Sequence, residues 1–400
     1  MNARFETQRL IQLIFGFVMM LFTGVSYAWS LFAGPLQQDM AWTADETSLV
    51  FTISILMLCA GSLIGGLLDK RLGSRTTFFA GAACIATGLV GCSFASEIWQ
   101  MYIFYGMFAG FAIGLFYNNI ITTVGSWYPN RVGFVSGLML MGYGMGALVL
   151  GPILSVLISS FGWRTAFVAL GLAFAAFGVL AALVVRRSPV ERGEDTETIA
   201  ADVEQLSPAG VVRRANFWVF VLWAICMGGV GVGIIGHAST IATALKAAPA
   251  AVVLATGLMS LANGVARPVW GAFYDRFRIE GVEVAVTVVL ALGLAVVEAA
   301  LVSQSVALLL VAALVVGAGY GGVSPGIAAF VRTKFGLVNY KQNFGLAICC
   351  IGPYAFGAYI LGVLLVTFGS YVAAVPYLFI ILVAGAVLLV PANLMARRST

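Results

Sequence analysis

Long runs of apolar residues, separated by short polar segments, make up most of the sequence. Each run is at least as long as the roughly 20 apolar residues that a helix needs to cross a bilayer. Most runs are rich in glycine, which is typical of helices that pack closely in a membrane. The pattern predicts an all-α membrane protein with twelve transmembrane helices. Their expected ranges are 10–34, 47–68, 76–95, 98–123, 132–157, 163–184, 216–243, 250–273, 282–303, 305–330, 341–366 and 371–394.

Composition supports a multi-pass membrane protein. Of the 400 residues, 61% are hydrophobic and 9% are charged, with a mean hydropathy of +1.03. Soluble proteins carry about 25% charged residues. All six cysteines fall inside the apolar runs and lack metal-ligand spacing, so we expect neither disulfides nor a metal site, and no cofactor. The first run is too long for a signal-peptide core and is predicted to remain as a helix.

The basic residues are distributed unevenly between the two sides of the predicted membrane. Eighteen of the 21 lysines and arginines lie in the segments on one side, which include both termini, whereas the other side has only Arg164 and Lys246. Cytoplasmic segments are enriched in lysine and arginine. We therefore expect a cell (inner) membrane protein with both termini in the cytoplasm. This distribution accounts for the net charge of +5, so we do not expect a nucleic-acid partner.

The two halves of the chain repeat a short motif. GGLLDKRLGSR follows the second predicted helix and GAFYDRF follows the eighth, which places Asp69 and Asp275 at matching positions. The expected division is a six-helix half over 1–185, a cytoplasmic linker over 186–215 and a second six-helix half over 216–400. This loop resembles the signature of the major facilitator superfamily, in which substrate is held near the midplane between two such halves. The resemblance implies a gating role for Asp69 and Asp275, in which an acid faces a helix N-terminus and neighbouring arginines.

Arg267 is the only cation that lies away from the ends of the predicted transmembrane helices. Placing a guanidinium in hydrocarbon costs from ~3 to ~17 kcal/mol, so such a residue faces a protein interior or a water-filled cavity. Pro268 follows it and predicts a local kink. We interpret Arg267 as the anchor for a small anionic substrate. The alternative is a side chain that extends to the interface or pairs with helix carbonyls.

Other polar residues in the predicted helices are few. His237, the sole histidine, and Glu298 lie towards the outer ends of their helices, where a structural hydrogen bond or an interfacial position is an alternative to a role in proton coupling or gating. The remaining candidates can equally be packing residues; they are Leu31, Tyr117, Asn118, Tyr320, Cys349, Cys350 and Tyr354.

Four stretches resemble the oxalate:formate antiporter and monocarboxylate transporter families: SYAWSLFAGPL, WYPNRVGFVSGL, NGVARPVWG and NFGLAICC. The resemblance implies that Arg267 binds the substrate carboxylate and that Asn118, Tyr320, His237 and Cys350 line the pocket. Asn263 stands where animal monocarboxylate carriers have the aspartate thought to carry the proton, and an asparagine cannot titrate. Ile351 stands where the oxalate antiporter has a second cation. A dicarboxylate would therefore keep an uncompensated charge, which favours a monocarboxylate.

These observations predict a monomeric secondary transporter, lying in the lipid bilayer, that moves a small monocarboxylate of the lactate or pyruvate type together with a proton by alternating access. Arg267 is expected to bind the carboxylate, with Asn118 and Tyr320 on the remaining oxygen. Leu31 and Cys349-Cys350 would form an apolar wall. Tyr117, Tyr354 and Asn263 are further pocket candidates. The alternatives are an organic-anion antiporter or another exporter of the same fold, and a sensor that binds the anion without transporting it. An enzyme is not expected, because no nucleophile–base pair or nucleotide-binding motif is present.

Overall fold

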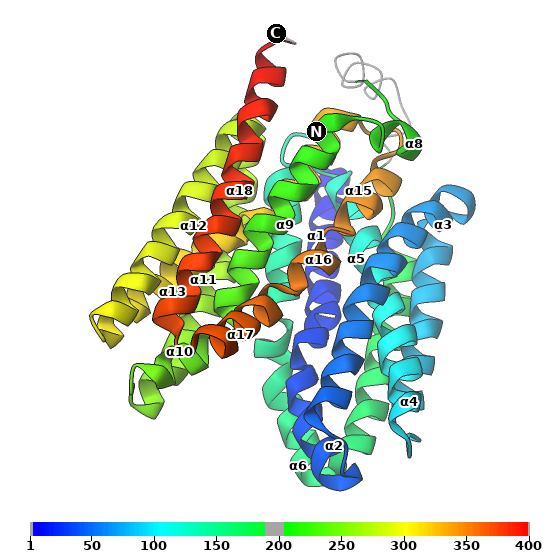
Figure 1. Ribbon diagram of the computed structural model, residues 1–400. Helices are drawn as coiled ribbons and strands as arrows, with labels where there is room; N and C mark the ends of the chain where they lie inside the picture. Colours follow the sequence, from blue (N-terminus) through cyan, green and yellow to red (C-terminus); the bar gives the residue numbers. More distant parts are fainter. Residues whose placement is uncertain (1–2, 189–203, 399–400) are drawn as a thin grey trace. The chain divides into compact units, whose positions relative to one another are not determined.

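The computed structural model describes residues 3–188 and 204–398, and it contains no strand in these residues. Figure 1 shows the helices. A bilayer leaves backbone groups without water partners, and a helix satisfies them within one segment, which explains this architecture. Among the described residues, ten helical segments are long and apolar enough to cross a membrane. Residues 189–203, which are half of the predicted linker, lie outside the described residues.

Two of the ten segments each contain two of the predicted transmembrane helices. α3 (Ala44–Cys92) and α6 (Val132–Val184) are interrupted at Gly73 and Gly162, where φ is +83° and +79°. Glycine lacks a Cβ and adopts such angles without steric cost, so the chain can turn sharply at these points. Dividing both helices there gives twelve transmembrane segments. The prediction of an all-α protein with two sets of six helices is confirmed.

The helices fall into two compact units. The first contains the described residues up to Leu206 together with Val331–Cys349. Its elements, besides α3 and α6, are α1 (Ala3–Thr23), the 3-10 helix η1 (Gly24–Ala28), α2 (Trp29–Met40), α4 (Ile98–Met101), the π-helix η2 (Tyr102–Ala109), α5 (Gly110–Gly125) and α15 (Tyr340–Ile348). α3 and α5 approach closely because glycines face the contact. A Cβ on Gly61 would lie 2.1 Å from the carbonyl oxygen of Phe111.

The second unit contains Ser207–Phe330 and the described residues from Cys350 onward. Its elements are α8 (Pro208–Val211), α9 (Ala215–Gly236), α10 (Ala238–Ala244), α11 (Pro249–Arg276), α12 (Ile279–Val302), α13 (Val306–Gly321), most of α14 (Val323–Phe335), α16 (Ile351–Ala355), α17 (Gly357–Phe368) and α18 (Tyr371–Arg398). The predicted eleventh transmembrane helix is thus broken at Cys349-Cys350, with α15 in the first unit and α16 and α17 in the second. The predicted domain bounds 1–185, 186–215 and 216–400 stay predictions.

Candidate functional site

Arg267 lies inside α11, and its side chain is buried, with 3% of the residue exposed. It precedes the last residue of α11 by nine positions, or about 14 Å along the axis. α11 continues through Pro268 as one helix, although the missing N–H of a proline leaves the Gly264 carbonyl without its intrahelical donor. A guanidinium is always charged. Its burial in an apolar transmembrane helix is expensive, which makes Arg267 a candidate site residue.

Asn263 lies one turn before Arg267 on α11, at the contact between α11 and α13. Glycines of α13 allow the two helices to approach: a Cβ on Gly317 would lie 2.4 Å from the Met259 carbonyl oxygen, and one on Gly321 would lie 2.8 Å from that of Asn263. The Oδ1 atom of Asn263 is buried and accepts no hydrogen bond from the described residues. The amide therefore offers an unused acceptor one helical turn from the arginine.

Tyr320 of α13 and Tyr354 of α16 are buried and contact each other edge to face, with ring centroids 6.3 Å apart. Two glycines of α9 make room for the rings. A Cβ on Gly231 would lie 2.4 Å from the Tyr320 ring, and one on Gly228 would lie 2.4 Å from the Tyr354 ring. The spacing of these glycines thus holds two predicted pocket residues together in the second unit.

The predicted site residues are divided between the units. The second unit contains Arg267, Asn263, Tyr320, Cys350, Tyr354, His237, Glu298 and Asp275; the first contains Leu31, Tyr117, Asn118, Cys349 and Asp69. Asp275 is half-buried near the end of α11, and Glu298 is half-buried in α12. Leu31 is half-buried in α2, near Gly151. The roles predicted for these residues stay predictions.

Asn118 has already used both of its amide hydrogens. Nδ2 donates to the backbone oxygen of Ser62 at 2.6 Å and to that of Lys341 at 3.0 Å. Its Oδ1 is buried and accepts no hydrogen bond from the described residues. In this conformation Asn118 can therefore accept a hydrogen from a ligand but cannot donate one to a carboxylate. The neighbouring Tyr117 ring lies against Tyr143 and parallel to Phe344.

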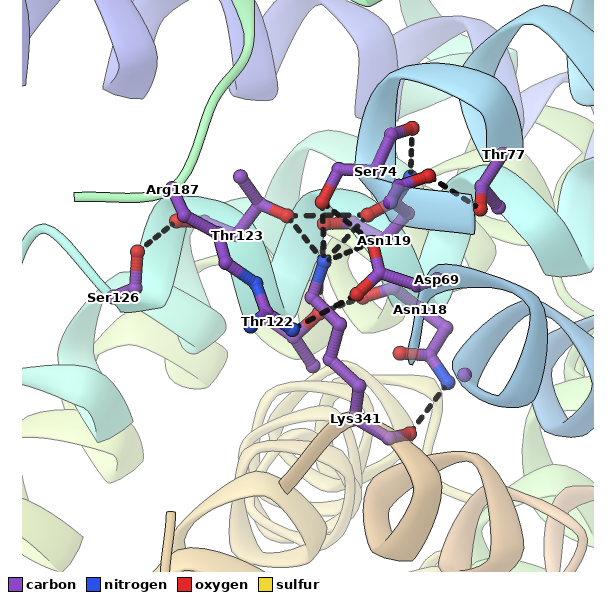
Figure 2. A network of polar contacts seen from close by, with 12 residues as sticks. Asp69, Ser74, Thr77, Asn118, Asn119, Thr122, Thr123, Ser126, Arg187 and Lys341 are labelled. Atoms are coloured by element: carbon purple, nitrogen blue, oxygen red, sulfur yellow. Dashed lines mark hydrogen bonds and ion pairs between the residues drawn. The ribbon is translucent and has the colours of Figure 1, made fainter. Parts of the chain in front are cut away.

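A buried lysine next to Asn118 is the centre of a polar network that the sequence did not predict (Figure 2). The Nζ atom of Lys341 donates to Asp69 Oδ1 at 2.9 Å. The same Nζ atom also donates to three uncharged side-chain oxygens at 2.7 to 2.9 Å: Ser74 Oγ, Asn119 Oδ1 and Thr123 Oγ1. An ammonium has three hydrogens, so the four acceptors share them. We call these five residues and Arg187 the Lys341 cluster.

Asp69 connects the two cations of the Lys341 cluster. Its Oδ2 accepts from Arg187 Nη2 at 2.8 Å, while its Oδ1 binds Lys341. Lys341 is in the first turn of α15, and Arg187 follows the end of α6. Asp69 therefore pairs with a lysine from the first turn of a helix and with an arginine, and the motif resemblance implied an acid near arginines for gating. The gating role itself stays a prediction.

The end of the linker is attached to the same helix. Gln205 Oε1 accepts from the backbone nitrogens of Leu337 and Val338 at 2.9 and 3.0 Å. The backbone oxygen of Leu206 accepts from Asn339 Nδ2 and Asn343 Nδ2 at 3.1 and 3.0 Å. We call Gln205 and Leu206 the linker clasp. It holds the segment that leads into α15.

Lys341 is one of the eighteen basic residues that the sequence assigns to the cytoplasmic side, but only 4% of it is exposed. Three polar residues in a row, Lys341, Gln342 and Asn343, begin the predicted eleventh helix, and they are all buried. Consecutive polar residues cannot all face water on a helix that packs against others. This run of three polar residues is the feature of the sequence that indicates a buried polar contact with another segment.

The fold and these buried charges define a membrane carrier. The sequence profile of the Major Facilitator Superfamily matches residues 14–240, more than half of the chain. The chain belongs to this superfamily.

Relatives with assigned activities share low identity with the chain. It is 25% identical to the oxalate:formate antiporter of Oxalobacter formigenes over 259 residues, 65% of this chain and 61% of that protein. It is 26% identical to monocarboxylate transporter 1 of Homo sapiens over 196 residues, 48% of this chain and 39% of the relative. The aligned part thus spans less than two thirds of either protein. The structure of the proton:xylose symporter XylE superposes with a TM-score of 0.75 at 14% identity, covering 96% of this chain and 95% of that one, which shows the fold alone.

Proposed function

We propose that this protein transports a small monocarboxylate of the lactate or pyruvate type, together with a proton, by alternating access in the cell inner membrane, with both termini in the cytoplasm. The observation that carries the proposal is the burial of Arg267 within α11, at 3% exposure. Arginine presents a planar fork that binds a carboxylate through two parallel hydrogen bonds. Two relatives named for carboxylate transport support the substrate class.

Asn263 and Tyr320 are the side chains of the second unit that we assign to the rest of the substrate. Asn263 lies one turn from Arg267 and has an unused buried acceptor, Oδ1. A hydroxyl group on the carbon next to the carboxylate would donate to that oxygen, whereas a keto group would need the amide hydrogens instead. Asn118 remains a predicted ligand that would act only as an acceptor, and Leu31 remains a predicted part of the apolar wall.

An exchanger of organic anions is the second candidate, because one relative is an oxalate:formate antiporter. Ile351, the half-buried first residue of α16, occupies the position of that family's second cation. One arginine neutralises one carboxylate. We therefore favour a monocarboxylate as the substrate of either transport mode.

The test is uptake by purified protein in liposomes. Labelled lactate is offered with unlabelled pyruvate, formate, acetate or oxalate as competitors, with and without a pH gradient and with and without anion inside. Lactate or pyruvate uptake driven by an inward proton gradient into liposomes without internal anion supports the proposal. Uptake that needs an internal anion and ignores the gradient supports the exchanger. Uptake of none of these anions contradicts the substrate class.

A matched pair of variants connects the result to the site. Arg267→Ala should abolish uptake, because it removes the only cation that lies away from the ends of the predicted transmembrane helices. Arg276→Ala, at an exposed position at the end of the same helix, should retain it. Equal uptake by both variants would contradict the assignment of Arg267 as the anion site.

A further inference from the structure

His237 lies where α9 ends and α10 begins, and its imidazole makes two short contacts. Nδ1 lies 2.8 Å from the hydroxyl oxygen of Tyr371, the first residue of α18. Nε2 lies 2.9 Å from the backbone oxygen of Ala358 in α17. Thr240 Oγ1 lies 2.6 Å from the same tyrosine oxygen and donates to the backbone oxygen of His237 at 2.9 Å. These four contacts connect helices of the second unit.

The number of hydrogens available to these contacts depends on the charge of the imidazole. Each contact needs one hydrogen between its two heavy atoms, because facing lone pairs repel at these distances. The hydroxyls of Tyr371 and Thr240 supply one each, and the carbonyls supply none. A neutral imidazole supplies one more, whichever nitrogen carries it. The neutral cluster therefore has three hydrogens for four contacts.

A second proton on the imidazole completes the set. Nε2–H donates to the Ala358 carbonyl and Nδ1–H donates to the Tyr371 oxygen. The tyrosine hydroxyl then donates to Thr240, and the Thr240 hydroxyl donates to the backbone oxygen of His237. Every hydrogen has one acceptor and every short contact has one hydrogen. The four contacts therefore accommodate a doubly protonated histidine with one hydrogen in each contact.

We infer that His237, Tyr371 and Thr240 form a proton-binding site, in which a proton from the aqueous phase adds to Nδ1 and the tyrosine hydroxyl turns from Nδ1 to Thr240. The inference rests on the proposed function for its role in transport, because it names the group that takes up the coupled proton. Asn263 cannot do so, since an amide does not titrate. We call the three residues the His237 cluster.

The elements around the His237 cluster bring no charged side chain into contact with the imidazole. α10 carries no titratable residue, and α18 contributes Tyr371. α17 carries Tyr359, which is 70% exposed, and α9 carries Cys226, three turns away. Lys246, after α10, and Glu298 of α12 form no hydrogen bond or ion pair with the imidazole in the described structure. The side chain and backbone groups that contact the imidazole nitrogens are therefore those of Tyr371 and Ala358.

Protonation changes how strongly the helices are held together. The doubly protonated cluster has one more hydrogen bond than the neutral one, and this bond, from Tyr371 to Thr240, joins α10 to the start of α18. Thr240 is exposed and gives water access to the cluster, while Tyr371 is 7% exposed. Loss of the proton removes one connection between these helices. That is the coupling between proton release and helix movement that a symporter needs.

The test uses the fact that the chain has a single histidine. Protein labelled with ¹⁵N only in histidine, carrying a purification tag without histidine, gives one pair of ring-nitrogen signals in an NMR spectrum. These signals distinguish the doubly protonated ring from either neutral tautomer. The spectra are recorded across the physiological pH range, in which histidine exchanges its proton.

Thr240→Val is the decisive variant. Without the threonine hydroxyl, two contacts remain for the imidazole, and the neutral ring and the tyrosine supply both hydrogens. Protonation then gains no bond, so the ratio of doubly protonated to neutral histidine at a given pH should fall by about twofold to tenfold, the effect of one net hydrogen bond. Thr240→Ser keeps a hydroxyl and should restore the ratio of the original protein.

Thr243→Val is the matched control, because Thr243 is also exposed on α10 but its hydroxyl donates to the Ser239 carbonyl. It should leave the ratio unchanged. Tyr371→Phe should lower the ratio as Thr240→Val does, which keeps the test decisive if one variant folds poorly. An unchanged ratio in both Thr240→Val and Tyr371→Phe would overturn the inference, as would an equal fall in Thr243→Val.

The NMR result does not depend on substrate, so the two proposals fail separately. Monocarboxylate uptake with an unchanged histidine ratio in both Thr240→Val and Tyr371→Phe would overturn the proton site and leave the proposed substrate intact. A fall in the ratio without uptake of any monocarboxylate would support the proton site and contradict the proposed function. Where uptake is present, Thr240→Val should also reduce its stimulation by an inward proton gradient, and Thr243→Val should not.

Discussion

Lys341 and Asp69 are 272 positions apart in the sequence and form an ion pair of 2.9 Å, with side chains that are 4% and 2% exposed. The pair joins the first turn of α15 to α3 inside the first unit. Burying two charges is expensive, and the cost is offset only when further hydrogen bonds satisfy both groups. Ser74, Asn119, Thr123 and Arg187 supply those bonds.

Lys341→Met is predicted to destabilise the protein by about 3–5 kcal/mol, the usual cost of removing one partner from a buried pair. The remaining oxygens would face each other without a cation, and Asp69 would keep only the partly exposed Arg187 as a charged partner. Thermal unfolding in detergent measures the change.

The double variant Asp69→Asn with Lys341→Met is the control for this prediction. Removing both charges avoids an uncompensated carboxylate, so the double variant should be more stable than Lys341→Met alone. Strictly additive losses would show that the two charges do not stabilise each other.

Gln205→Ala is predicted to loosen the segment that leads into α15. The change removes the acceptor of the backbone nitrogens of Leu337 and Val338, so these amides should exchange their hydrogens faster. Hydrogen–deuterium exchange of peptides covering 335–343 measures the effect. Gln304→Ala, in a loop of the second unit where the side chain only donates to the Leu301 carbonyl, is the control and should leave that region unchanged. Equal exchange in both variants would contradict a role for the linker clasp.

The helices could be predicted from the sequence because the bilayer imposes their length and apolar character on each segment separately. The same reasoning predicts that Arg267 lies inside the protein, since a charged side chain in an apolar helix is too costly to expose to lipid. Its 3% exposure agrees. α11 continues through Pro268 as a single helix, and the breaks at Gly73 and Gly162 are shorter than the loops expected there, because only the glycine has a non-helical backbone.

The Lys341 cluster could not be predicted in the same way. Its members come from α3, α5, α15 and the chain after α6, and no local pattern shows which of these segments meet. Counting charges by segment treats every lysine near a helix end as solvated, although Lys341 is enclosed by oxygens. Asn118 shows the converse difficulty. A polar residue in a transmembrane helix suggests a residue that binds substrate, but the amide hydrogens of Asn118 donate to backbone carbonyls.

Arg267→Lys tests the geometry of the anion site separately from its charge. An ammonium keeps the positive charge but cannot form two parallel hydrogen bonds to a carboxylate. Loss of one charge-assisted hydrogen bond should weaken monocarboxylate binding by about tenfold or more. Binding is measured by competition against labelled lactate, with Arg276→Lys as the control at the end of α11. Unchanged affinity in Arg267→Lys would mean that the substrate does not use the guanidinium fork.

Ile351→Lys tests why a dicarboxylate is disfavoured. Ile351 is half-buried at the start of α16, in the same unit as Arg267. The sequence resemblance implies that it stands where the oxalate antiporter has a second cation. With one arginine, the second carboxylate of oxalate would lose its water without gaining a counter-ion, which is costly in a site of low polarity. An added ammonium should supply that counter-ion, so oxalate should compete more effectively with labelled monocarboxylate in the variant. The monocarboxylate itself should bind more weakly, because the new charge then lacks a partner.

Ile351→Met, which changes shape without adding charge, should retain the original preference. If oxalate inhibits lactate binding to the same extent in Ile351→Lys and in Ile351→Met, position 351 does not face the anion. The preference for monocarboxylates then has another cause.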